Sequence, residues 1–146
     1  YYSHSGEQNQ QDLLITGGTT TVLSDVFRSI IKLLLAVGIK PYRKAYVEPM
    51  LMPVNAPEWM VPADFTVEMY SRVATGLCRP GLGVVTDLLT VNASIIPVVD
   101  HGNKEIEYNA SILSSVKDKN LNIKGEKKQE FKSLIDKFMA TPAHIW

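Results

Sequence analysis

The stretch that decides the fold runs from Cys78 to Ala110 and reads C-R-P-G-L-G-V-V-T-D-L-L-T-V-N-A-S-I-I-P-V-V-D-H-G-N-K-E-I-E-Y-N-A. It begins as the end of an apolar strand, which Pro80 and Gly81 interrupt. Apolar residues then recur at helical spacing over 84–91, and a run typical of a buried strand follows over 94–99. Strand, glycine turn, helix and strand in this order predict a parallel sheet whose ligand lies at the carboxyl ends of the strands.

Strands and helices alternate in the same way outside this stretch. Residues 13–16 predict a buried strand, Gly17 and Gly18 follow it at once, and a predicted helix over 22–37 ends at Gly38. The residues expected on the inward face of this helix are Val22, Val26, Ile30, Leu33 and Val37. Further predicted elements are strands at 42–47 and 65–67, a proline-containing loop at 50–62, and helices at 68–75, 104–115 and 126–139.

This alternation is typical of an α/β fold with a mostly parallel sheet. We predict a Rossmann-like three-layer sandwich over residues 13–146. Residues 1–12 are polar and lack periodicity, so we expect a flexible linker or terminus there.

Composition excludes little but favours one globular domain. The 146 residues suffice for a full core, and their 15 basic and 15 acidic side chains cancel, which gives no support to a nucleic-acid partner. The longest apolar run is far shorter than the roughly 18 residues of a membrane span. One cysteine and three scattered histidines form no metal pattern, so we expect neither a metal nor a cofactor. With no visible signal peptide, a cytoplasmic location is the expectation.

Two glycine-containing turns are the strongest candidates for a binding site. Each follows a predicted strand and opens a predicted helix, so backbone N–H groups and the positive helix end point at one spot, which suits phosphate. The residues of these turns are Gly17, Gly18 and Thr19, and Gly81, Leu82 and Gly83. A purely structural role for both turns stays open, because glycine is common in turns.

Of three further residues near the second turn, two allow a binding role or a structural role, and one has only a structural role. Asp87, six residues after Gly81, either accepts hydrogen bonds from a ribose diol or is a surface acid that favours the helix dipole. Arg79 either binds a phosphate or pairs with a local acid. Cys78 lies between apolar neighbours and is predicted to be a core thiol.

The loop after residue 99 gathers side chains that suit the hydroxyls of a sugar, namely His101, Asn103 and Glu105. His101 is otherwise a plain loop residue, and Asn109 in the following helix either caps the loop or faces water. The chain shows no Ser/His/Asp set and no Walker loop, so no catalytic residue is assigned.

Several of these segments resemble the donor-binding half of two-domain B-type glycosyltransferases. They are C-R-P-G-L-G-V-V-T-D-L-L at 78–89, I-I-P-V at 95–98 and H-G-N-K-E-I-E-Y-N-A at 101–110. The opening L-L-I-T-G-G-T-T-T at 13–21 is similar to the first strand and glycine turn of the same half. The nearest likeness is to the bacterial N-acetylglucosaminyltransferases that complete the lipid-linked peptidoglycan precursor, and it covers roughly residues 13–115.

The resemblance implies a role for each matching residue. The residues that it assigns to the two walls of a diphosphate cleft are Gly17, Gly18, Thr19, Gly81, Leu82 and Gly83. Asp87 takes the place of the acid, usually Glu, that holds the nucleotide ribose. Glu105 and Ile106 stand where the family has two glutamines, and Asn109 matches the Asn that follows them.

The resemblance also implies a function, which is binding of a UDP-sugar or similar donor and stabilisation of its diphosphate leaving group by backbone amides and helix ends. In such hexosyltransferases the acceptor site and the usual base lie in an N-terminal domain. This chain has room for one domain, so we expect the acceptor domain in cis or on a partner subunit, and an inactive isolated fragment. The alternatives are a sugar-nucleotide hydrolase or epimerase of the same fold, for which His101 is the local candidate, and a non-catalytic domain that has lost the donor site.

Overall fold

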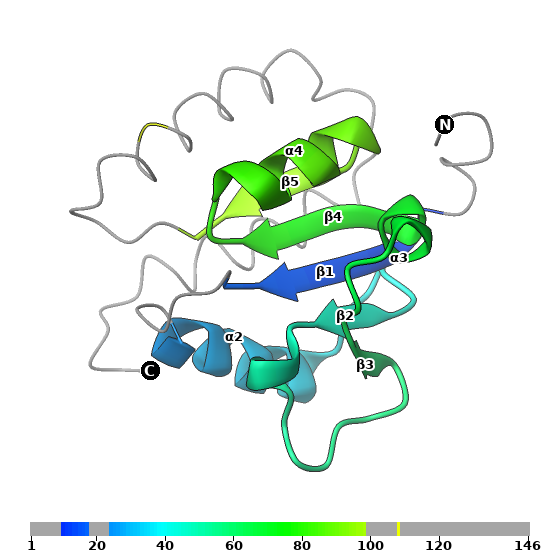
Figure 1. Ribbon diagram of the computed structural model, residues 1–146. Helices are drawn as coiled ribbons and strands as arrows, with labels where there is room; N and C mark the ends of the chain where they lie inside the picture. The colour runs from blue at the N-terminus through cyan, green and yellow to red at the C-terminus, as the bar shows by residue number, and fades with distance from the viewer. Residues whose placement is uncertain (1–9, 18–23, 99–107, 109–146) are drawn as a thin grey trace.

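The computed structural model of the chain describes residues 10–17, 24–98 and 108 (Figure 1). Within these residues the chain alternates strands and helices, as an α/β fold does. The elements are β1 (Asp12–Thr16), α2 (Ser24–Val37), β2 (Ala45–Val47), the 3₁₀ turn η1 (Pro49–Leu51), β3 (Met60–Pro62), α3 (Val67–Arg72), β4 (Val73–Cys78), α4 (Leu82–Thr90) and β5 (Ser94–Pro97).

The described strands form one five-stranded sheet in the order β3-β2-β1-β4-β5, and all the neighbouring pairs are parallel. The chain adds β2 and β3 on one side of β1, then crosses to add β4 and β5 on the other side. The order therefore reverses between β1 and β4. In open α/β sheets such a reversal leaves a crevice at the carboxyl ends of the two strands, where ligands bind.

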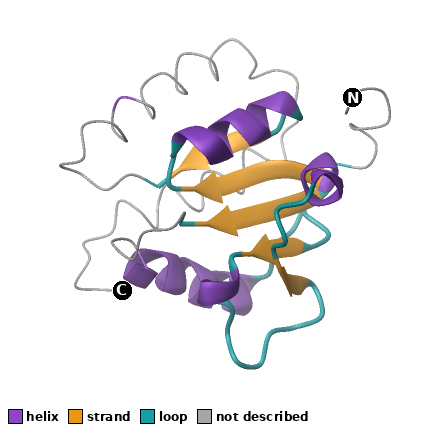
Figure 2. Ribbon diagram, in the orientation of Figure 1, coloured by secondary structure: helices purple, strands orange, loops and turns teal. Residues whose placement is uncertain are grey.

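Helices cover both faces of the sheet, so the described residues form three layers (Figure 2). On β1, Leu13 and Ile15 belong to a core cluster that includes Phe27 and Ile30 of α2. Leu14 belongs to a second cluster, together with residues of α3 and α4. Side chains alternate across a strand, so the two clusters lie on opposite faces. The predicted α/β class and parallel sheet are confirmed in this part of the chain.

The buried stripe of α2 differs from the predicted one. The buried residues are Phe27, Ile30, Ile31 and Leu34, which follow the i, i+3, i+4, i+7 spacing of a helix face. Leu33 is only half-buried, and Val37 is 56% exposed. The expected inward face is therefore wrong for these two residues. The exposed Asp25, Arg28 and Lys32 recur at helical spacing and mark the solvent side, and the buried stripe lies opposite them.

The segment from β2 to β4 differs most from the elements predicted from the sequence. The predicted strand at 42–47 is shorter and begins at Ala45, and the predicted loop at 50–62 ends in the strand β3. No strand occurs at 65–67. Phe65 there has a positive φ of 56°, and Thr66 caps α3, its hydroxyl accepting a 3.1 Å hydrogen bond from the Met69 amide. The cap ends extended backbone at this point.

Helix α3 and strand β4 also have other bounds than predicted. The helix ends at Arg72, not at residue 75, and β4 begins at the next residue. Val73 pairs with Asp12 of β1 and Thr75 pairs with Leu13, with a register shift between Asp12 and Leu13. Pairing with the central strand thus converts the end of the predicted helix into strand.

Polar side chains at the start of the sheet contact segments that are distant in sequence. Gln10 donates from its amide to the carbonyls of Val73 and Val91, at 2.9 and 2.6 Å. Asp12 is fully buried, and Arg43 lies 3.5 Å from its carboxylate. Strand β1 thus begins one residue before the predicted strand, inside the segment expected to be a linker. The predicted helices at 104–115 and 126–139 lie outside the described residues, apart from Tyr108, which is helical and exposed.

Candidate functional site

The two glycine turns leave the same edge of the sheet. Strands β1 and β4 are parallel neighbours, and Thr16, the last residue of β1, pairs with Cys78, the last residue of β4. The Arg79 amide continues this pairing with a 3.2 Å hydrogen bond to the Thr16 carbonyl. Gly17 and the Pro80–Gly81 turn therefore start side by side (Figure 1). This is the point at which the strand order reverses.

The amino end of α4 opens directly from the second turn. Gly81 is the N-cap, with φ −74° and ψ 155°, and has no side-chain capping bond. The Val85 amide donates to the Gly81 carbonyl at 3.0 Å. The amides of the first turn carry the positive end of the helix dipole. The amides of Leu82 and Gly83 belong to this turn.

Open space lies beside the glycines of the second turn. A Cβ added at Gly81 or at Gly83 would meet nothing within 4 Å, whereas a Cβ at Gly17 would lie 3.3 Å from the Phe27 ring. Close packing against Phe27 thus accounts for a glycine at position 17. No such packing accounts for the glycines at positions 81 and 83. Leu82 between them is 72% exposed. A ligand can approach the backbone closely here.

Asp87 lies one turn into α4. It is the sixth residue of a helix that begins at Leu82, so it stands in the second turn, beyond the range in which the dipole acts most strongly. Its side chain is exposed. It is four residues from Gly83 and so shares a helix face with it. The Asp87 carboxylate is therefore on the same side of α4 as Gly83 of the open turn.

Cys78 and Arg79 flank the turn in different environments. Cys78 is fully buried, as predicted, and burial raises the pKa of its thiol to about 12. The thiol is therefore a packing group and not a nucleophile at neutral pH. Arg79 is half-buried beside the end of β1. The other predicted site residues lie outside the described residues: Gly18, Thr19, His101, Asn103, Glu105 and Asn109.

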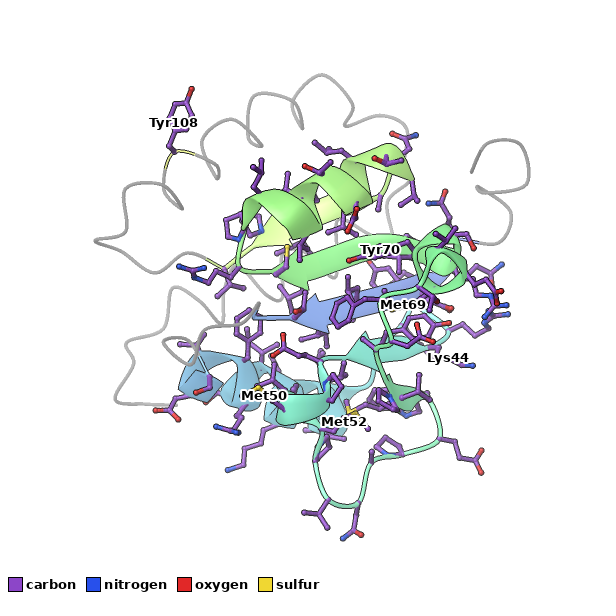
Figure 3. All side chains as sticks on the ribbon, viewed as in Figure 1. Lys44, Met50, Met52, Met69, Tyr70 and Tyr108 are labelled. Carbon is purple, nitrogen blue, oxygen red and sulfur yellow. The ribbon has the colours of Figure 1, made fainter. Side chains whose placement is uncertain are left out.

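A pocket that sequence reasoning missed lies on the other side of β1 from α4. Its volume is about 110 Å³. It is lined by Gly17, Ser24, Phe27, Arg28, Glu48, Met50 and Leu51. Figure 3 labels Met50 at this edge of the sheet and Lys44 at the opposite edge. The pocket thus shares Gly17 with the first glycine turn.

Glu48 is the acid of this pocket. Its amide donates to the Ile15 carbonyl at 2.9 Å, and its Oε1 accepts a 2.5 Å hydrogen bond from the Thr16 hydroxyl. Both contacts tie it to the end of β1. The available sequence signal was an acid directly after the second strand of a strand-helix-strand unit, a position that often faces the ligand of such units. Sequence reasoning placed the end of that strand correctly but did not consider the next residue.

Over the described ranges 10–17 and 24–98 and at residue 108, no group of three His, Cys, Asp or Glu side chains is placed to hold a metal ion. No helix in this part is long and apolar enough to cross a membrane.

Comparison with protein-family models, with curated proteins and with solved structures finds no significant match to this chain.

Proposed function

We propose that this chain binds a nucleoside diphosphate sugar, most simply a UDP-sugar, as the donor-binding domain of a glycosyltransferase. The diphosphate would lie over the carboxyl ends of β1 and β4. The acceptor and the catalytic base would come from a second domain, in cis or on a partner subunit.

One observation carries the proposal, which is the pairing of Thr16 with Cys78. It places two glycine turns on adjacent strand ends, at the reversal of strand order where open α/β sheets bind ligands. One glycine turn alone would be weak support. Two that share an edge can supply donors to both ends of a pyrophosphate.

The proposed function requires this edge of the sheet to bind an anion. The Leu82 and Gly83 amides and the positive end of α4 are suited to the negative charge that develops on a leaving diphosphate. Glycine at the N-cap supplies no side-chain capping bond to these amides. The exposed Asp87 on the same helix face would accept hydrogen bonds from ligand hydroxyls. The resemblance of residues 78–89 to the donor-binding half of glycosyltransferases supports the same assignment.

The test is a calorimetric titration of the full chain and of Leu82→Glu with UDP and UDP-glucose. Leu82 is 72% exposed, and a carboxylate in the first turn of a helix favours the dipole, so the variant should fold normally. Its charge would lie next to the bound diphosphate. We expect the dissociation constant to rise about tenfold or more, from electrostatic repulsion at short range.

Leu89→Glu is the matched control. It adds the same charge to an exposed leucine at the far end of α4, and it should leave the affinity within about twofold, because solvent and salt screen the interaction at that distance. No binding by the unmodified chain would contradict the proposal, and so would equal losses in both variants.

Product analysis separates the proposed function from its enzymatic alternative. Incubation with UDP-glucose and no acceptor should leave the donor intact. Release of free UDP and glucose would instead indicate a sugar-nucleotide hydrolase of the same fold.

A further inference from the structure

We propose that the pocket beside Gly17 holds a vicinal diol of the bound ligand and that Glu48 is the residue that accepts its hydrogen bonds. This inference rests on the proposed function and adds to it a second acid, distinct from Asp87. The diol belongs either to the nucleoside ribose or to the transferred sugar.

The first argument is the position of Glu48. It follows β2 directly, and β2 is the parallel neighbour of β1 with Ile15 opposite Val47. The carboxylate therefore stands at the same sheet edge as the first glycine turn. Gly17 contributes both to that turn and to the pocket. The pocket is therefore next to the first residue of that turn.

The second argument is the way in which the carboxylate is held. The Thr16 hydroxyl engages Oε1, which fixes the orientation of the group. A carboxylate has about four lone-pair positions, and this hydrogen bond uses one of them. Glu48 is half-buried and shares the pocket with Phe27 and Leu51. A half-buried carboxylate that is held in one orientation is suited to accepting further hydrogen bonds from a ligand.

The third argument concerns the type of ligand group. A carboxylate repels phosphate, so the pocket is not an extension of the diphosphate site. Arg28 lines the same pocket and brings the opposite charge, which makes a neutral, hydroxyl-rich group the better fit. The volume of about 110 Å³ is enough for several water-sized groups. It matches part of a sugar better than a whole nucleotide.

The experiment is calorimetric titration of the full chain and of Glu48→Gln with UDP, 2′,3′-dideoxy-UDP and UDP-glucose. Glutamine keeps the size and the acceptor for Thr16 but loses the charge. We expect the dissociation constant of the variant to rise about tenfold for each ligand that carries the bound diol, because hydrogen bonds to charged groups are the stronger ones. Glu58→Gln, an exposed acid on the β2–β3 loop, is the control and should change no affinity.

The three ligands identify the source of the diol. Weaker binding of UDP and UDP-glucose with unchanged binding of dideoxy-UDP assigns Glu48 to the ribose. Weaker binding of UDP-glucose alone assigns it to the transferred sugar.

Two results would overturn the inference and leave the proposed function standing. One is a Glu48→Gln variant that binds all three ligands as tightly as the unmodified chain does. The other is an equal loss for all three, dideoxy-UDP included, which would make Glu48 a support for the Gly17 turn only. Absence of any binding by the unmodified chain would overturn both proposals together.

Discussion

Gly76 and Gly83 lie on either side of the turn after β4, and they are glycines for different reasons. A Cβ at Gly76 would fall 2.4 Å from a methyl group of Leu88, inside the core between β4 and α4. A Cβ at Gly83 would meet nothing within 4 Å. The first glycine lets a helix pack closely on the sheet. The second has no packing reason, which is why we associate it with a ligand.

We therefore predict opposite effects of alanine at these two positions. Gly76→Ala should lower the free energy of unfolding by about 1–3 kcal/mol, since Leu88 must move within a packed core. Gly83→Ala should leave it unchanged or raise it by up to about 1 kcal/mol, because alanine is the better helix former. Urea unfolding of both variants measures this. Similar losses at the two positions would contradict the packing described for α4.

Some residues of the candidate site could be identified from the sequence, and others could not. The glycines and Asp87 could be found in the sequence, because turns and helix positions depend on local residues. Glu48 could not be ranked above other acids, since its partner Thr16 is 32 residues away. Cys78 was identified as a core thiol from its apolar neighbours alone.

At the scale of elements, α2 shows that the polar residues of a helix indicate its inward face. Asp25, Arg28 and Lys32 recur at helical spacing and mark the side away from the sheet. The opposite side carries Phe27 and Ile31, which belong to the core cluster that includes residues of β1 and β2. The prediction followed apolar residues alone and so placed Val37 on the inward face, although it is 56% exposed.

Two alanine substitutions in α2 test this orientation. Ile31→Ala should lower the free energy of unfolding by about 2–5 kcal/mol, as expected for a buried side chain. Val37→Ala should change it by less than about 0.5 kcal/mol, because Val37 is 56% exposed. Thermal and urea unfolding give both values. A larger loss at Val37 than at Ile31, which was not on the predicted face, would show that the predicted face is the true one.

At the scale of the whole molecule, the class of fold followed from the alternation of strands and helices, but the strand order did not. Nothing local to β4 indicates that it pairs with β1 and not with β3. The order comes from tertiary packing: helices on both faces of the sheet require the chain to cross over β1 after β3. The shared edge of the two turns is a consequence of that crossing.

The central claim is that the turn after β1 and the turn after β4 bind one diphosphate together. The most direct measurement is the titration of the ¹⁵N-labelled full chain with UDP, followed through the backbone amide signals. The amides of Gly17, Leu82 and Gly83 should shift together with one dissociation constant, while those of Arg43 and Lys44 at the opposite edge stay in place. Absence of shifts at the two turns, or different dissociation constants for them, would contradict the account.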